Sequence, residues 1–444
     1  MLELSRADGC IVVGVQEAAV NVRWANNTVT TSGVVDRASL AVISVIGRRV
    51  ASVTRTFFPD QQLESIVRES EALCQGRPEA PDFMPLVNDR AIDADFGAST
   101  AAADIRALDA LVPQIHRLFD SARNASIQTF GFADHKTVTL WLATSAGVRR
   151  RYTDRMGKVE ITGKSPDFSR SSWSGRAADD FSRVDLSERF ERLRERLSWF
   201  ERRIDMPAGQ YEVLFEPSCT ADLALGAYEY MTRRDADEGR SPYAKAGGGT
   251  ALGERLFGSV SIYSDPLEPG IGVSPFHVST ESSSAASVFD SGLPVARTSW
   301  VRKGVLENLI TPRYWMKQAN LTAPVLQINN LIVEGSGPSM EQMIATTERA
   351  LLVTCLWYIR PVDPQTALDT GLTRDGVFLV EHGRVVGAVN NFRWNMSSIA
   401  ALAQASELGQ SGMALPREHD EFLRVKAPPV RVERFNMSSK SDAT

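Results

Sequence analysis

The stretch GVFLVEHGRVVGAV, residues 376–389, contains two runs of β-branched and aromatic residues that flank Glu381-His382-Gly383. Two such runs on either side of a short glycine-containing turn predict a β-hairpin. Similar runs predict strands at 211–215, 258–263, 301–306 and 326–333, and helical spacing predicts helices over 220–234 and 339–350. Strands and helices thus mix without strict β-α-β alternation, which favours the α+β class.

The first part of the chain also predicts both kinds of element. Alternating apolar and polar residues predict strands at 20–24 and 40–53, the second range turning at Gly47-Arg48, and a strand pair at 137–143 and 148–153. Apolar residues at helical spacing predict helices over 63–74, 101–123 and 185–204. We therefore expect an N-terminal mixed sheet with helices.

Proline and aspartate mark two of the expected helix boundaries. Pro113 lies inside the second helical pattern and is expected to kink or divide it. Asp185 stands three residues before Glu188, the spacing of an N-terminal capping box with Asp in place of Ser or Thr. The Ser-, Asp- and Arg-rich residues 163–185 predict open chain before that helix.

A chain of 444 residues exceeds one ordinary core, so more than one domain is expected. The third helical pattern ends at Met206-Pro207-Ala208-Gly209, which we interpret as the boundary. This divides the chain into an N-terminal domain, residues 1–206, and a strand-rich C-terminal domain, residues 207–444.

Charge and cysteine content limit the classes of function. The net charge is −5, and Lys and Arg are scattered along the chain, which predicts no nucleic-acid partner. The four cysteines lie far apart without a CxxC pair, which is typical of a reducing compartment. The N-terminal apolar run is too short for a signal sequence or a membrane span. We therefore expect a cytoplasmic protein that does not contact a membrane.

The residues themselves offer few candidates for chemistry. The five histidines form no HExxH motif, which excludes a zincin site at the level of motifs, and no GxSxG elbow is present. Cys219 stands near the predicted start of a helix, where a thiol pKa is lowered, and His277 is the candidate base for a cysteine nucleophile. A small packed residue is the other interpretation of Cys219.

Five blocks of the chain resemble the actinobacterial branch of the TldD/PmbA metallopeptidase family, in the family's order. They are NVRWANNTVTTSG (21–33), PAGQYEVLFEPSCTADL (207–223), SDPLEPG (264–270), SVFDSGLPVARTSWVRKGVLENL (287–309) and LLVTCLWYIRPVDPQTALDTGLTRDGVFLVEHGRVVGAVNNFRWN (351–395). The resemblance implies one of two kinds of subunit. TldD-type chains bind a metal through an HExxxH helix and a later cysteine, whereas TldE/PmbA-type chains lack these ligands and pair with a TldD-type chain.

In this sequence the motif would fall in the helix after Pro217, where residues 224–229 read ALGAYE. Ala224 and Leu225 stand where the motif has its first histidine and glutamate, and Glu229 is a single remaining carboxylate. Since neutral imidazoles are needed to hold zinc, no metal and no catalytic residue are expected in this chain. The resemblance thus implies a metal-free, TldE-like subunit.

The same resemblance implies a heterodimer with a TldD-like subunit that carries zinc and hydrolyses unfolded or small modified peptides. Arg360, Arg374 and Arg393 lie in the most family-like block and could bind a peptide carboxylate or form structural ion pairs. The runs 356–359 and 392–394 are candidates for an interface or for buried strands. Two alternatives stay open: a hydrolase acting alone through Cys219, and a regulatory interaction protein.

Overall fold

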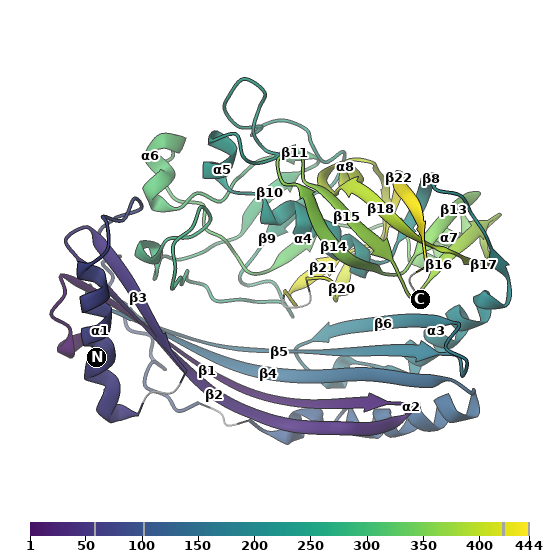
Figure 1. The fold of residues 1–444 in the computed structure, drawn as a ribbon, viewed down its shortest axis with the longest axis horizontal. Helices are drawn as coiled ribbons and strands as arrows, with labels where there is room; N and C mark the ends of the chain where they lie inside the picture. The colour runs from purple at the N-terminus through teal and green to yellow at the C-terminus, as the bar shows by residue number, and fades with distance from the viewer. Residues whose placement is uncertain (57–58, 101–102, 420–421, 443–444) are drawn as a thin grey trace.

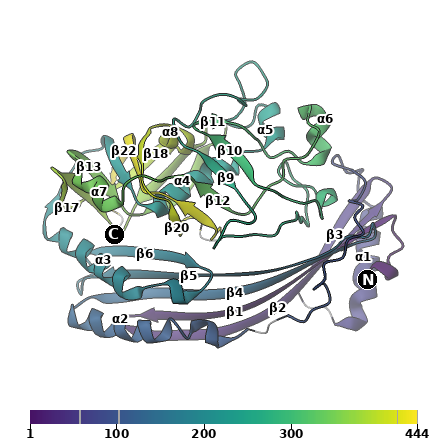
Figure 2. The same cartoon turned by 180° about the vertical axis from the view of Figure 1, so that it is seen from behind.

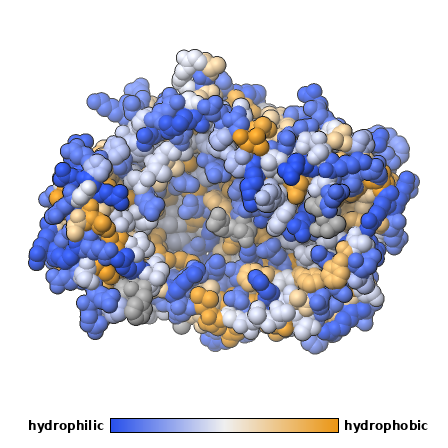
Figure 3. Space-filling model, viewed as in Figure 1, coloured by the Kyte–Doolittle hydropathy of each residue, from blue (hydrophilic) through white to orange (hydrophobic). Residues whose placement is uncertain are grey.

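The computed structural model of the protein describes residues 1–56, 59–100, 103–419 and 422–442. The first half of the chain forms a long sheet that curves beneath the second half (Figures 1 and 2). The face seen in Figure 1 is largely hydrophilic and is hollowed between the two halves (Figure 3). Within the described ranges no helix is both long and apolar enough to cross a bilayer.

The N-terminal sheet has the strand order β3-β2-β1-β4-β5-β6. Its strands are β1 (Gly9–Ala25), β2 (Thr28–Ile46), β3 (Arg49–Arg55), β4 (Gln128–Thr144), β5 (Arg149–Lys164) and β6 (Ser171–Ala178). The α+β class is confirmed, with one refinement: this sheet is antiparallel rather than mixed in strand direction. The reason is that most neighbouring strands are joined by short turns, which only antiparallel strands allow.

Helices cover both ends of the N-terminal sheet, α1 at the end formed with β3 and α2 and α3 at the opposite end. They are α1 (Leu63–Gln75), α2 (Val112–Asn124) and α3 (Leu186–Ser198), with 3-10 turns η1 (Leu2–Leu4), η2 (Asp60–Gln62), η3 (Ile105–Leu108), η4 (Phe181–Arg183) and η5 (Trp199–Glu201). A core between the sheet, α2 and α3 contains Trp24, Phe119 and Phe190. At the other end, Phe276 and Phe289 from the second half pack on the sheet together with Ile43.

The second half contains two further sheets. The larger has the order β14-β15-β18-β22-β8-β13-β16-β17-β7, with β19 paired to β22, and the smaller has the order β11-β10-β9-β12-β21-β20. Their strands are β7 (Arg203–Ile204), β8 (Gly209–Phe215), β9 (Ile262–Ser264), β10 (Thr298–Arg302), β11 (Val305–Leu306), β12 (Leu331–Val333), β13 (Arg349–Val353), β14 (Leu356–Asp363), β15 (Leu368–Thr373), β16 (Val377–Glu381), β17 (Arg384–Val389), β18 (Asn391–Ser397), β19 (Ala405–Leu408), β20 (Gly412–Ala414), β21 (Val425–Ala427) and β22 (Val430–Ser441).

Helix α4 (Pro217–Glu229) packs among these sheets and forms the centre of their shared core. The other helical elements are α5 (Arg233–Asp237), α6 (Met316–Ala319), α7 (Met340–Ala345), α8 (Ser398–Ala403), η6 (Val288–Asp290) and η7 (Arg313–Trp315). The core includes Phe215, Trp300, Trp394 and Phe435, which are fully buried. This core holds α4 in place, and the candidate site is built around that helix.

Several local predictions are confirmed. Residues 376–389 form the hairpin β16–β17 around His382, and Gly47 turns the hairpin β2–β3. Pro113 divides the second helical pattern, since α2 begins beside it and η3 lies before it. Residues 101–102 of that pattern lie outside the described residues.

Several local predictions are wrong. Residues 163–185 are not open chain but include β6, which pairs with β5. Ile204 belongs to β7 rather than to a helix, because α3 ends at Ser198. The range 301–306 is a turn at Lys303-Gly304 between β10 and β11, not one strand.

The aromatic runs differ in burial. Phe392 and Trp394 are fully buried, so β18 is a core strand rather than an interface. β14 lies at the edge of the large sheet, and Tyr358 on it is exposed. β7 lies just before the predicted boundary at 206–207 but pairs with β17 of the second half. The boundary itself stays a prediction.

Candidate functional site

Helix α4 is buried along nearly its whole length. Pro217 occupies its first turn, where the missing N–H costs no hydrogen bond, and residues 218–228 are all buried. An apolar surface on every side is typical of a core helix. Gly226 permits close contact with α8, since a Cβ there would lie 2.9 Å from Ser398 Oγ. The polar side chains of α4 are therefore the candidates for a special role.

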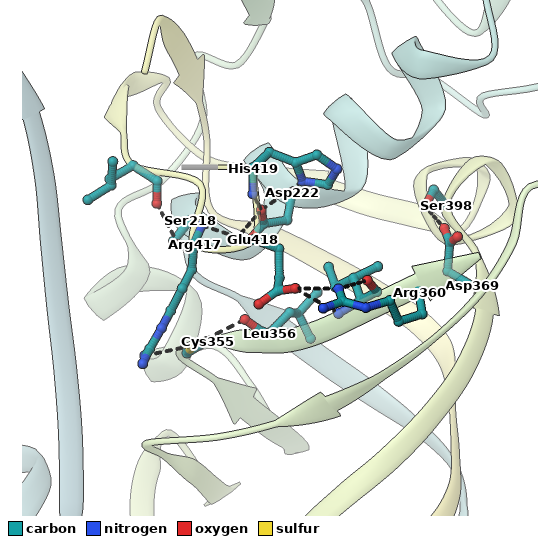
Figure 4. A network of polar contacts seen from close by, with 12 residues as sticks. Ser218, Asp222, Cys355, Leu356, Arg360, Asp369, Ser398, Arg417, Glu418 and His419 are labelled. Carbon is teal, nitrogen blue, oxygen red and sulfur yellow. Dashed lines mark hydrogen bonds and ion pairs between the residues drawn. The ribbon is translucent and has the colours of Figure 1, made fainter. Parts of the chain in front are cut away.

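Asp222 is a fully buried carboxylate on α4 that holds a distant segment of the chain. It accepts hydrogen bonds from the backbone N–H groups of Arg417 (3.0 Å), Glu418 (3.1 Å) and His419 (3.3 Å). It also contacts Nδ1 of His419 at 3.1 Å (Figure 4). We call residues 417–419 the capping segment, because Asp222 fixes it over the buried helix.

Arg417 connects the capping segment to both halves of the protein. Its guanidinium donates to Asp375 (2.8 Å) and to Cys355 Sγ (3.1 Å). It lies between the rings of Trp173 on β6 and Trp357 on β14, 4.8 and 4.7 Å from their centroids. Burial lowers the pKa of Arg417, but Cys355 and Asp375 outweigh it and raise the pKa above its usual value. The residue is therefore a permanent, enclosed cation.

Glu418 and Arg360 form the outer side of this network. Glu418 accepts from the backbone N–H of Ile359 (3.0 Å) and from Arg360 (3.2 Å), and Arg360 stacks on Tyr358. Arg374 lies over the ring of Trp357. The structure thus brings two of the predicted arginines, Arg360 and Arg374, to the capping segment, and each has structural contacts there.

Arg393 lies apart from them on the outward face of β18. It is exposed, and it donates to Thr370 on β15 at 3.3 Å. The three arginines therefore do not converge on one carboxylate-binding position in this structure. Their role in binding a peptide stays a prediction.

The predicted motif position lies in the core rather than in an open site. Ala224 and Leu225 are buried in the apolar cluster, and the hydroxyl of Tyr228 donates to Ile328 O. Glu229 is exposed at the end of α4. Two apolar side chains and one exposed carboxylate do not fit a zinc ion, which needs three or four nitrogen, sulfur or oxygen ligands. The described ranges contain no group of three potential metal-ligating side chains.

The cysteine alternative is not supported by the geometry. Cys219 is fully buried, and burial raises the pKa of its thiol well above the usual value, with Cys355, Asp222 and Glu216 adding to the rise. His277 lies in the region that packs on the N-terminal sheet, and burial lowers its pKa against the smaller effect of Asp290. A buried neutral thiol in a different cluster from its candidate base is a poor nucleophile.

His419 is the titratable group of the network. Burial lowers its pKa, but Asp222, Glu229 and Glu418 outweigh burial, so the pKa is raised above 6.5. Asp369 also faces this cluster; burial raises its pKa, opposed by Ser398 and assisted by Glu229. The protonated imidazole is thus favoured in the folded state, where it neutralises part of a cluster of carboxylates.

We expect the stability added by His419 to fall as pH rises. Because its folded pKa lies above its unfolded pKa, the contribution is fully present below pH 6.5 and is lost as pH passes through the raised folded value. The difference in melting temperature between wild type and His419→Gln should shrink from pH 6 to pH 9. His382→Gln, at an exposed histidine paired with Glu348, is the control for loss of an imidazole outside the network. Parallel curves for wild type and His419→Gln would contradict this.

Reasoning from the sequence missed the main members of the network. Asp222, Asp375 and Trp173 were not candidates. One signal was available: Asp222 is the only carboxylate in the interior of a largely apolar helix, and a buried charge needs a partner. The sequence does not show which residue is that partner, because the partner lies almost two hundred positions away along the chain.

Comparison with known proteins relates the fold to a family. The family described as PmbA/TldA metallopeptidase C-terminal domain matches residues 208–439. The fold is similar to that of TldE from Thermococcus kodakarensis, with a TM-score of 0.78 and 14% identity over 97% of this chain and 96% of that one. The search of curated proteins returned no match.

Two other solved structures have the same fold. One, from Thermotoga maritima, is described as a candidate modulator of a DNA gyrase; its TM-score is 0.75 at 14% identity, over 96% of this chain and 95% of that one. The other, from Bacteroides thetaiotaomicron, has a similar description, a TM-score of 0.75 and 13% identity, over 98% and 95% of the two chains. At such identities these likenesses show the fold alone, whereas the family match covers more than half of the sequence, and the chain therefore belongs to the TldD/PmbA family.

Proposed function

We propose that this chain is a non-catalytic, TldE-like subunit that pairs with a TldD-like, zinc-binding subunit in a cytoplasmic, peptide-hydrolysing complex. The observation that carries the proposal is the composition of residues 224–229 in helix α4. By the resemblance this stretch stands at the family's metal-binding position; its residues are buried in the apolar core apart from one exposed carboxylate, which cannot replace the missing ligands. Without zinc, no bound water is activated for attack on a peptide bond.

The network around Asp222 supports the same proposal. A peptidase site must leave room for a substrate and a water molecule beside its catalytic groups. Here Asp222 is instead saturated by three backbone N–H groups and an imidazole of its own chain. The capping segment therefore closes the helix that a catalytic subunit would leave accessible.

The experiment compares this chain alone, a TldD-like subunit from the same organism, and the two together. We would measure bound zinc by atomic emission and cleavage of a denatured, fluorescently labelled protein. We expect the chain alone to bind no stoichiometric zinc and to cleave nothing, and the pair to do both. Replacing the motif histidines of the partner should abolish cleavage by the pair without preventing assembly. Stoichiometric zinc or cleavage with this chain alone would overturn the proposal.

The class of substrate is part of the proposal. Unfolded proteins, a modified peptide precursor and an amide-linked intermediate of specialised metabolism are the three candidates, and a panel of all three separates them. The hydrolase alternative predicts cleavage by the isolated chain that a thiol reagent abolishes. The regulatory alternative predicts salt-dependent binding to DNA or gyrase, which the net charge of −5 disfavours.

A further inference from the structure

The turn between β5 and β6 holds an aromatic side chain outwards. Asp167 accepts hydrogen bonds from the hydroxyl of Ser165 (2.5 Å) and from the N–H and hydroxyl of Ser169 (3.1 and 2.8 Å), so the turn has a fixed shape. Phe168 in this turn has a φ of +58°, a left-handed conformation that bulky residues rarely adopt. Its ring meets that of Phe130 at 6.2 Å, yet 48% of the residue stays exposed. Burial in the core therefore does not explain why the chain keeps an aromatic residue in this conformation, and strain of this kind points to a role in function.

Phe168 forms one wall of a pocket between the two halves of the protein. The pocket has a volume of about 460 Å³, which lies in the range of sites that bind small molecules. Its apolar walls are Phe168, Phe200, Ile204, Val377 and Val389. These residues come from the β5–β6 turn, η5, β7, β16 and β17, so only the folded protein has this pocket.

Hydrogen bonds within the chain hold the polar side of the pocket in place. Ser171 donates to Asp375, which also accepts from Arg417 (2.8 Å). The side-chain oxygen of Asn390 accepts from the N–H of Met206 (2.8 Å). The walls are thus already arranged, and a ligand can enter with little rearrangement of the protein.

Two cations stand beside the pocket without an ionic partner among the described residues. Arg203 is exposed at the pocket and donates through Nη2 to the carbonyl of Ser169 (2.7 Å), which leaves its other donors available. Lys164 Nζ lies 5.7 Å from the centroid of the Phe168 ring. An anionic group of a ligand would therefore find both an unpaired guanidinium and an unpaired ammonium close to Phe168.

The carboxylates of the pocket do not cancel these charges. Asp375 is bonded to Arg417, and Asp205 pairs with Lys440 at 2.6 Å. Asp442 is exposed to solvent, where its charge is screened. The pocket thus combines apolar walls with positive charge at its edge, which is the chemistry of a site for an apolar anion.

We propose that this pocket binds a small carboxylate that carries an aromatic or branched aliphatic group. Arg203 pairs with the carboxylate, because a guanidinium presents several donors to the two acceptor oxygens. The apolar group packs against the rings of Phe168 and Phe200. The inference goes beyond the proposed function, since the pocket is formed by other residues than 224–229 and requires neither zinc nor a partner subunit.

The test measures the binding of hydrocinnamate to the full chain by isothermal titration calorimetry, without zinc and without a partner. Hydrocinnamamide has the same shape without the charge, and acetate has the charge without the ring. We expect the wild-type protein to bind hydrocinnamate about tenfold more tightly than either of them, because only this ligand uses both Arg203 and the apolar walls.

Two variants separate the contributions of charge and ring. Arg203→Gln should weaken the binding of hydrocinnamate about tenfold and remove its preference over the amide. Phe168→Gly should weaken it about fivefold, while the melting temperature stays equal or rises, because glycine adopts a positive φ without strain. Arg302→Gln is the matched control: Arg302 is an exposed arginine paired with Glu307 outside the pocket, and its loss should change binding by less than about twofold.

Three results would overturn the inference. The first is no saturable binding of hydrocinnamate by the wild-type protein, or equal binding of the acid and the amide. The second is unchanged binding in Arg203→Gln. The third is a lower melting temperature of Phe168→Gly with normal binding, which would show that Phe168 serves only to stabilise the turn. Failure of the zinc and cleavage experiment, with hydrocinnamate bound as expected, would remove only the proposed complex.

Discussion

Asp222→Ala should destabilise the protein by about 3–5 kcal/mol, because it leaves a favoured imidazolium and three backbone N–H groups without their buried acceptor. The Asp222 side chain has no exposed surface, so water cannot replace the lost contacts unless the capping segment moves. The measurement is the thermal unfolding of the second half, together with the rate at which trypsin cuts after Arg417. We expect a lower melting temperature and faster cutting.

Asp205→Ala is the matched control for this variant. Asp205 is an exposed carboxylate that pairs with Lys440, and such pairs contribute about 0–1 kcal/mol. Asp222→Asn separates charge from shape, since the amide keeps one acceptor but cannot neutralise His419. If Asp222→Ala had the same melting temperature as Asp205→Ala and trypsin cut it no faster, the capping segment would be held by other contacts.

Arg417→Ala should have an effect of similar size, about 3–5 kcal/mol, by leaving Asp375 buried without its strongest partner. It also removes a cation from between Trp173 and Trp357, so the two halves lose a shared contact. The readout is hydrogen exchange, in which the amides of β6 should exchange faster while those of β2 do not change.

Arg360→Ala serves as the control because Arg360 pairs with Glu418 on the same segment but is largely exposed. It should cost less than about 1 kcal/mol. Arg417→Met keeps much of the packing volume without the charge. A normal exchange rate of β6 in Arg417→Ala would show that Arg417 is not needed to hold the halves together.

Features set by neighbouring residues could be predicted from the sequence. Asn26 and Asn27 form a turn with positive φ values, and Asp185 accepts from the N–H groups of Ser187 and Glu188 as a helix cap. Pro113 lies in the first turn of α2. Each result depends on the chemistry of three or four adjacent residues, which a sequence shows directly.

β6 could not be predicted because its own residues, SSWSGRAA, carry little strand signal. It forms because β5 offers a complete ladder and because Trp173 and Ala177 are buried against Leu415 from the second half. Its conformation is thus decided by tertiary contacts, which override weak local preference. The same applies to the range 339–350, where a capped helix ends at Ala345 and Ala350 joins a strand.

The candidate site likewise combines features that the sequence shows directly with contacts that only the folded structure shows. The loss of ligands at Ala224 and Leu225 could be read from the sequence once the motif position was known. The pairing of Asp222 with His419 could not, because it depends on how two distant segments meet across α4. The arginines of the family-like block were found, but their partners came only from the structure.

The position of β22 has a consequence for biosynthesis. This strand, residues 430–441, lies between β18 and β8 in the middle of the large sheet, although it comes last among the strands. While the ribosome is still translating the preceding residues, β8 and β18 each present an unpaired edge to solvent or to other nascent chains. Such edges invite aggregation, so we expect the newly made protein to depend on chaperones until translation passes residue 441.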